Sequence, residues 1–279
     1  MKKLLTFILF ICFIINKNAI IYSASEALNI WSKSLFPVLY PTLILSDVLL
    51  ASGIINKIPK VLYNIYSRIF KTSPYGLFVF LVSVFSATPT NAKILKDLYD
   101  NKLIDKNSLS KILSQTIFFN PILILTFSNL KVLIIMWVSN ILTSFILRNK
   151  LVSNDTTLKD INFKFNLNES IEKNMKTILN ILGTLTLFLS LSSIIPIKNQ
   201  ILKTFISGIL EITSGFSRIK LYLTSPLNDI MMLIFVSLAS FSIIMQIKSI
   251  LKETKFDSKY FYVSRFITLI LSLFIYFIA

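Results

Sequence analysis

Long stretches without a charged residue are the feature that most restricts the fold of this chain. Residues 72–92, 177–197 and 230–247 contain no Asp, Glu, Lys or Arg. A helix of about 20 mostly apolar residues crosses a bilayer and satisfies its own backbone hydrogen bonds there. The pattern therefore predicts an all-α, polytopic membrane protein. The other membrane-associated segments are expected at 4–16 with 18–25, 34–56, 112–130, 132–147, 204–217 and 266–279.

Residue content excludes several classes of function. Of the 279 residues, 54% are hydrophobic, 15% are charged and none is histidine. Histidine acid–base catalysis and histidine metal sites are therefore excluded. The single cysteine, Cys12, allows neither an intramolecular disulfide nor a cysteine zinc site. The net charge of +16 is spread through nearly every loop, so it does not fix the membrane orientation, and we expect no nucleic-acid partner. We expect no cofactor, no metal and no enzyme activity.

The N-terminus has two interpretations. Lys2 and Lys3, the apolar residues 4–15 and the small residues 23–25 together have the pattern of a cleaved signal peptide. The polar interruption at 16–18 and the apolar segments that follow favour an uncleaved first helix.

A polar stretch divides the chain. Residues 149–169 are expected to be an extramembrane linker between a first membrane half, residues 1–148, and a second half, residues 170–279.

The two halves resemble each other. Residues 82–88 match residues 236–242 at an offset of 154, and Ser110 matches Ser264 at the same offset. In both places an apolar run rich in Ser and Thr ends at a polar break, and a Lys-bearing amphipathic stretch follows. The pattern predicts an internal duplication of the kind found in transporters, with inverted repeats.

The break of the first half lies at residues 86–93. Pro89 removes a backbone donor, and Asn91 is a residue that tolerates a left-handed conformation. The run before the break, residues 75–87, is 13 residues long and too short to cross a bilayer. We expect a re-entrant helix that meets a second helix N-terminus, where free N–H groups favour an anion. A proline-kinked ordinary helix is the alternative.

Two charged residues are candidates for function. Asp47 lies in the middle of an apolar segment, where a carboxylate must be paired or protonated. It is expected to be a coupling site or the partner of a pocket lysine, unless the segment is shifted and places it at the interface. Lys93 follows the break by one turn, so it could neutralise an anionic substrate or extend to the interface.

Uncharged polar residues and one further carboxylate complete the candidate substrate site. Each has a structural alternative, a helix–helix hydrogen bond or, for Glu211, a helix cap between close-packing glycines. The candidates are Ser86, Thr88, Asn91, Lys93, Asn120, Glu211, Thr213 and Gln246, with Asp47 as the coupling residue.

Several of these residues lie in motifs of a known family. Residues 86–93, SATPTNAK, resemble the S-G-[FY]-P-x-G-A-K signature of sporulation integral membrane proteins of the YlbJ type, which are nucleoside-recognition (Gate-domain) membrane proteins. Residues 35–47 are similar to the family's F-P-x-L-x-P…S-E segment, and residues 208–215, GILEITSG, to its G-x-x-E-x-T-x-G motif. The remaining motifs align, in the family's order, with Ser114, Asn120-Pro121, Gln246 and Ser264-Arg265.

The chain also departs from that family. Ala87 and Asn91 replace signature glycines, and Ile244 stands where a histidine is expected. The resemblance implies a transporter-like protein of the bacterial cell membrane or forespore membrane. Spore-related members are associated with moving dipicolinic acid, a small aromatic dianion, and other Gate-domain relatives handle nucleosides. The implied partners are therefore the lipid bilayer and a dipicolinate-like organic anion or a nucleoside.

Three functions are open. A transporter for a small organic anion would work by alternating access around a site where the broken segments of the two halves meet. A membrane-embedded enzyme would have only Asp47 and Glu211, in different halves, for its chemistry. A non-transporting scaffold or assembly factor in sporulation or the envelope is favoured by the missing signature glycines.

Overall fold

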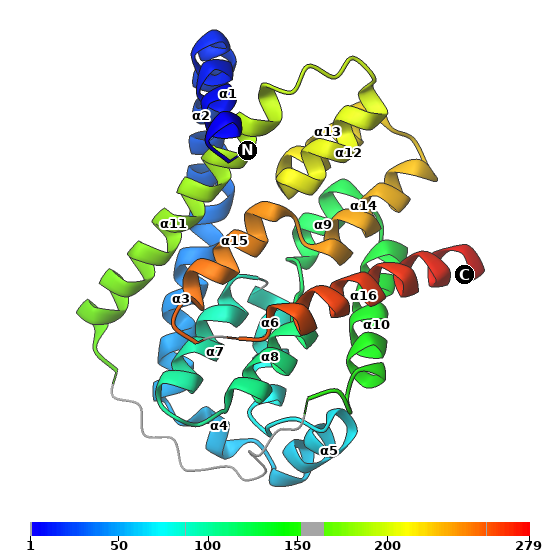
Figure 1. The fold of residues 1–279 in the computed structure, drawn as a ribbon. Coiled ribbons are helices and arrows are strands. Elements are labelled where there is room, and N and C mark those ends of the chain that lie inside the picture. The colour runs from blue at the N-terminus through cyan, green and yellow to red at the C-terminus, as the bar shows by residue number, and fades with distance from the viewer. Residues whose placement is uncertain (1, 87, 152–164, 255) are drawn as a thin grey trace.

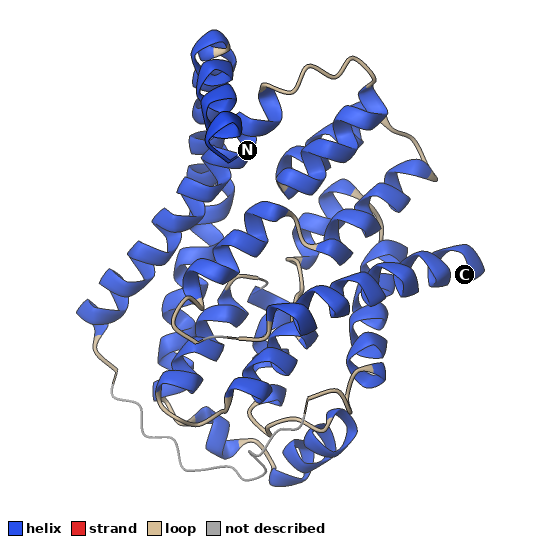
Figure 2. Cartoon of the chain, viewed as in Figure 1, coloured by secondary structure: helices blue, strands red, loops and turns tan. Residues whose placement is uncertain are grey.

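The computed structural model describes residues 2–86, 88–151, 165–254 and 256–279. All regular secondary structure in these ranges is helical, as predicted (Figure 2). Ala87 of the predicted break and most of the predicted linker, residues 152–164, lie outside the described residues. The elements are α1 (Lys2–Ile15), α2 (Lys17–Ile30), η1 (Trp31–Leu35), α3 (Phe36–Ala51), α4 (Ile54–Lys57), α5 (Lys60–Phe70), α6 (Gly76–Ser86), α7 (Thr90–Asp100), α8 (Lys106–Gln115), α9 (Pro121–Phe127), α10 (Leu130–Ile146), α11 (Leu167–Ser193), α12 (Gln200–Leu210), α13 (Ile212–Tyr222), α14 (Leu227–Leu238), α15 (Phe241–Ile250) and α16 (Ser258–Ile278).

A long helical rod forms one side of the molecule. α2, the π-helical turn η1 and α3 run without interruption over Lys17–Ala51, and α11 packs along α2 and α3 (Figure 1). The indole N–H of Trp31 donates to the carbonyl of Ile178 across this contact at 3.0 Å. The expectation of separate segments at 18–25 and 34–56 is therefore wrong, because the chain between them contains no helix-breaking residue and stays helical.

α10 and α16 carry their polar residues on the inside. Along α16, Ser264, Arg265, Thr268 and Ser272 are buried, whereas most of the large apolar side chains of this helix are exposed or half-buried. α10 packs against this polar face, and Thr143 hydrogen-bonds Thr268 at 2.9 Å. An apolar outer surface around a polar seam is the arrangement expected for helices whose outer face contacts lipid. The exposed apolar residues of α16 include Phe266, Ile270, Phe274 and Phe277.

Each half contains a helix pair interrupted near a Ser-rich position. α6 ends at Ser86 and α7 begins at Thr90, as the proline predicts. α14 ends at Leu238 and α15 begins at Phe241, with Ala239 between them in a left-handed conformation (φ 55°). Each pair is followed by a helix, α8 or α16, and these two helices pack against each other. Both halves therefore contain an interrupted helix pair followed by a further helix, which is the order that the sequence similarity of the halves predicts. That the two halves arose by duplication stays a prediction.

A third interruption lies at Glu211, between α12 and α13. The two helices pack closely, because a Cβ atom on Gly215 would lie only 2.4 Å from Cα of Gly208. A Cβ atom on Gly208 would lie 2.2 Å from the ring of Phe235 in α14. The expected role of these glycines in close helix approach is confirmed.

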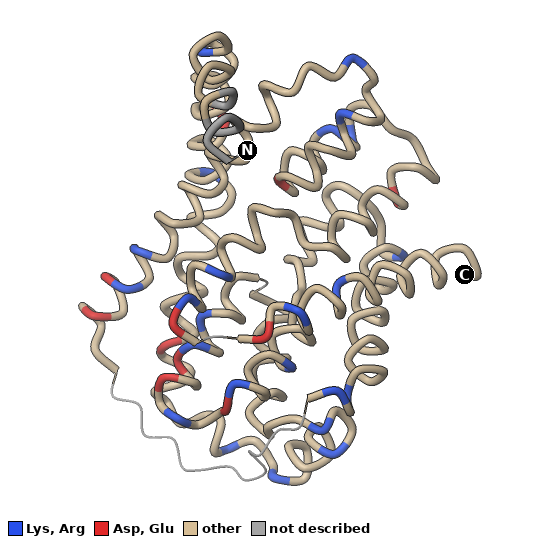
Figure 3. Tube along the Cα trace, viewed as in Figure 1, with Lys and Arg blue, Asp and Glu red and all other residues tan. Residues whose placement is uncertain are grey.

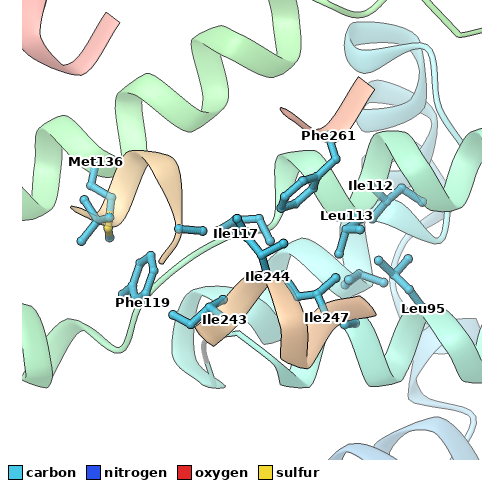
Figure 4. Close-up of a cluster of buried hydrophobic side chains, with 14 of the residues drawn as sticks. Leu95, Ile112, Leu113, Ile117, Phe119, Met136, Ile243, Ile244, Ile247 and Phe261 are labelled. Atoms are coloured by element: carbon cyan, nitrogen blue, oxygen red, sulfur yellow. The ribbon is translucent and has the colours of Figure 1, made fainter. Parts of the chain in front are cut away.

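Helices from both predicted halves share one hydrophobic core. Ile117 lies in the extended segment between α8 and α9, where it meets Ile244 of α15 and Phe261 of α16 (Figure 4). Leu113 of α8 and Met136 of α10 belong to the same cluster. The segments around the two breaks are therefore held against each other by apolar packing.

The protein is a multi-pass membrane protein. Within the described residues, four helical segments are long and apolar enough to cross a bilayer. Three shorter apolar helices accompany them, α6, α10 and α12. α6 has 11 residues, so it is too short to cross alone, as its sequence predicts. The four longer segments are Lys17–Ala51, Leu167–Ser193, Leu227–Ile250 and Ser258–Ile278.

Candidate functional site

Ionisable side chains gather where α3, α7 and the N-terminal part of α11 meet. Figure 3 shows acidic and basic positions interleaved along α7 and the first turns of α11. Four of them contact one another directly and are called the ion cluster below: Asp47, Lys93, Asp97 and Lys173.

Lys93 is the buried centre of the ion cluster, with a side chain only 2% exposed. Its ammonium group pairs with the carboxylate of Asp47 and lies 3.3 Å from the carboxylate of Asp97, one turn later on α7. It also donates to Oγ of Ser46 at 3.2 Å. The ammonium group is therefore paired inside the protein rather than exposed at its surface.

Asp47 links α3 to both neighbouring helices. Its Oδ1 receives the ammonium of Lys93 from α7, and its Oδ2 accepts from Ser170 at 2.6 Å and from Asn174 at 2.7 Å on α11. Lys173 of α11 pairs with Asp97. The two aspartates and two lysines balance in charge, which is the condition under which ions are tolerated away from water. Asp47 is therefore the partner of a lysine, and its role in coupling stays a prediction.

Two hollows lie beside the ion cluster. One of about 190 Å³ is bordered by Asp47, Asp97 and Lys173 together with residues at the start of α11. The other, of about 400 Å³, lies between α7, α11 and α15 and is lined by four lysines and two glutamates. These residues are Lys93, Lys96, Lys173, Lys176, Glu169 and Glu172.

Lys96 shows how the ion pairs change toward the exposed end of α7. It pairs with Asp100 at 2.8 Å and with Glu253 at 3.3 Å. Burial alone would lower the pKa of Lys96, but the hydrogen bonds and charges of Asp100 and Glu253 outweigh it, so the pKa is raised. This outer pair is a natural control for the buried one.

The first break holds two of the predicted polar residues against the extended segment that follows α8. Asn91 donates from Nδ2 to the carbonyl of Thr116 at 3.0 Å, and the backbone N–H of Thr88 donates to the carbonyl of Phe118 at 3.0 Å. The hydroxyl of Thr88 and Oδ1 of Asn91 are buried and have no hydrogen-bond partner within the described part of the chain. These two atoms remain able to bond a ligand.

The other predicted polar residues have local partners. The hydroxyl of Ser86 donates to the carbonyl of Val82 at 2.9 Å, and Asn120 caps α9 by accepting from the N–H of Ile122 at 2.8 Å. Gln246 of α15 is buried and donates to Ser242 at 3.2 Å. Ser86 also borders an apolar groove of about 370 Å³ between α3 and α6.

Glu211 and Thr213 form a separate polar unit. Glu211 is buried at the start of α13, where its Oε2 accepts from the N–H of Ser214 at 2.8 Å and from the hydroxyl of Thr213 at 2.5 Å. This is the geometry of an N-cap. The structure thus brings Asp47 and Lys93 together, and Thr88 with Asn91, while Glu211 and Thr213 hydrogen-bond within their own turn.

Four residues of this site escaped the sequence interpretation. Asp97 was detectable, because it lies four residues after Lys93, the spacing at which side chains of one helix face meet. Ser170, Lys173 and Asn174 were not, because they begin the second half beside a polar linker and nothing in their spacing points to Asp47 or Asp97.

Comparison with known proteins gives one distant relationship. The chain is 28% identical over 102 residues to the sporulation integral membrane protein YlbJ of Bacillus subtilis (strain 168). The match covers 37% of this chain and 25% of that protein, so the chain spans well under two thirds of the relative. No protein-family model and no solved structure matches the chain.

Proposed function

We propose that this protein is a membrane transporter for a small organic anion of the dipicolinate type, with a role in sporulation. The main observation in support of this proposal is the hollow between α7, α11 and α15. Its volume of about 400 Å³ suits a small-molecule site, for which about 300–1,000 Å³ is usual. Each of its four lysines is ion-paired with a carboxylate, so an anion would bind there by replacing one of these partners.

The hollow reaches the buried ion cluster, and this contact suggests a gate. A carboxylate that enters the hollow is a chemical substitute for Asp47 or Asp97 as the partner of Lys93. Since Asp47 lies on α3 and Lys93 on α7, exchange of partners would release one helix from the other. Uptake of a proton by Asp47 would break the same pair, which is how this residue would couple transport to an ion gradient.

The first break offers a second group of polar atoms that could bind a substrate. The hydroxyl of Thr88 and Oδ1 of Asn91 are buried polar atoms without a protein partner in the described residues. Buried polar atoms are normally hydrogen-bonded, so unpaired ones at a helix break are able to bond a ligand. The sporulation role is suggested by the distant relative, whose name states that it is an integral membrane protein of sporulation.

Transport into liposomes tests the proposal. The purified protein is reconstituted, and uptake of labelled dipicolinate, succinate and uridine is measured with and without a proton gradient. The proposal predicts uptake of the dicarboxylates. Uptake of uridine alone would favour a nucleoside transporter, and no uptake by folded protein would leave the scaffold as the better explanation.

Variants test the gate. Asp47→Asn keeps the shape of the side chain but removes the charge that pairs with Lys93, so we expect the proton dependence of uptake to be lost. Asp100→Asn is the matched control, because it removes a carboxylate from the more exposed ion pair with Lys96 on α7. Equal behaviour of the two variants would show that Asp47 has no coupling role.

A further inference from the structure

Arg265 lies deep in the molecule with most of its hydrogen-bonding capacity unused. It belongs to the inward polar face of α16 and is 1% exposed. Its Nη2 donates to the carbonyl of Ser114 at 2.6 Å and to Oδ1 of Asn140 at 2.9 Å. Nε and Nη1, which carry three of the five guanidinium N–H groups, are buried and have no acceptor among the described residues.

A second buried cation shows what a purely structural role looks like here. Lys111 of α8 is also fully buried and is likewise absent from the ion pairs found among the described residues. Its three N–H groups are all used, by the carbonyls of Lys71, Arg148 and Leu151. The chain can therefore satisfy a buried cation with backbone oxygens alone, and at Arg265 it does so only in part.

A further unpaired donor lies on α10. Trp137 lies one turn before Asn140 on α10, and its buried indole N–H also has no acceptor in the described part of the chain. Residues three apart on a helix share a face, and α10 packs along α16. Unpaired donors that include a cation without a counter-charge call for a ligand that only accepts hydrogen bonds and carries negative charge.

We infer that Arg265 binds the carboxylate of a small organic anion in an inner site between α8, α10 and α16. A guanidinium suits this ligand because its fixed, planar N–H groups match carboxylate oxygens. The bound anion would supply the missing charge and accept from Nε or Nη1. That this anion is also the transported substrate rests on the proposed function, whereas its binding does not.

Equilibrium binding to the purified, full-length protein in detergent tests the inference, with benzoate as the probe. Calorimetry should show saturable binding of benzoate and little or none of chloride or phosphate. Arg265→Gln should weaken benzoate binding by at least about tenfold, since it removes a charge-assisted hydrogen bond. Arg68→Gln, an exposed arginine of α5, is the matched control and should bind as the unaltered protein does.

If Arg265→Gln fails to fold, a second measurement still tests the inference. Trp31 and Trp137 are the two tryptophans of the chain, so in Trp31→Phe the fluorescence reports on Trp137 alone. Benzoate should change that fluorescence over the same concentration range as it binds. Saturable binding without a change in Trp137 fluorescence would overturn the location, and so would unchanged affinity in folded Arg265→Gln.

The outcomes separate this inference from the proposed function. Absence of saturable benzoate binding, or equal binding of chloride, overturns the carboxylate site. Benzoate binding that depends on Arg265 in a protein that transports no anion would support the site and refute the transporter. Anion uptake that is unaffected by Arg265→Gln would support the transporter and refute the idea that the anion at Arg265 is the transported substrate.

Discussion

Removal of the Lys93 ammonium should destabilise the folded protein more than any other single change in the ion cluster. Lys93→Met keeps the length of the side chain but leaves Asp47 and Asp97 with Lys173 as their only cation within the cluster. One buried carboxylate then lacks a counter-charge. Breaking a buried ion pair by removing one partner costs about 3–5 kcal/mol.

The contacts of Asp47 place the expected cost at the lower end of that range. Its Oδ2 keeps the hydrogen bonds from Ser170 and Asn174, and its side chain is 16% exposed, so the remaining carboxylate is partly solvated. We therefore expect Lys93→Met to lower the free energy of unfolding by about 3 kcal/mol. The double variant Asp47→Asn/Lys93→Met removes both charges and leaves Asp97 paired with Lys173, so most of that loss should be recovered.

Unfolding in mixed detergent and SDS micelles measures these differences for the single and double variants. The two substitutions should show a coupling energy of about 2 kcal/mol, because they remove a direct interaction. Lys96→Met is the control and should cost less than about 1 kcal/mol, since its ion pairs are more exposed. A cost below 1 kcal/mol for Lys93→Met, or strictly additive effects in the double variant, would refute the reasoning.

Three further predictions concern α11, α12 and α13. Gly208→Ala should lower the midpoint of thermal unfolding, with a cost of about 1–3 kcal/mol, because the new Cβ atom meets the ring of Phe235. Gly183→Ala in α11 meets nothing within 4 Å and should stabilise by up to about 1 kcal/mol, so equal effects of both changes would contradict the packing argument. Glu211→Ala should lower the free energy of unfolding by about 1 kcal/mol, because the cap on α13 is lost. Anion uptake by the folded variant should be unchanged. Lost uptake at unchanged stability would instead identify Glu211 as a ligand-contacting residue.

The helix interruptions were the most predictable part of the fold. Pro89 lacks a backbone donor, and α6 and α7 accordingly end and begin on either side of it. Glu211, a carboxylate inside an apolar run, coincides with the boundary of α12 and α13. Both signals are local, because a missing donor or a charged side chain affects helix formation within a few residues. The joined rod Lys17–Ala51 was missed, since the charges within it suggested a boundary where helical hydrogen bonding continues.

The candidate site was predictable only in part. The cost of burying Asp47 indicated that it needs a partner, and Lys93 was a candidate for an anion. Their pairing depends on α3 lying against α7, and the support from Asn174 depends on α11 lying against both. Contacts between helices far apart in sequence leave no local pattern, so these partners could not be derived from spacing.

The sequence by itself determined that this protein lies in a membrane and that it cannot use histidine chemistry. Charge-free apolar runs require a membrane, and the absence of histidine excludes histidine chemistry, because both follow from composition and the cost of moving charge into lipid. Tertiary structure alone decided which buried charges are paired. Lys93 meets two aspartates, Lys111 meets three carbonyls and Arg265 keeps unused donors, although all three are basic residues in amphipathic helices. That difference arises from which helix packs opposite each residue.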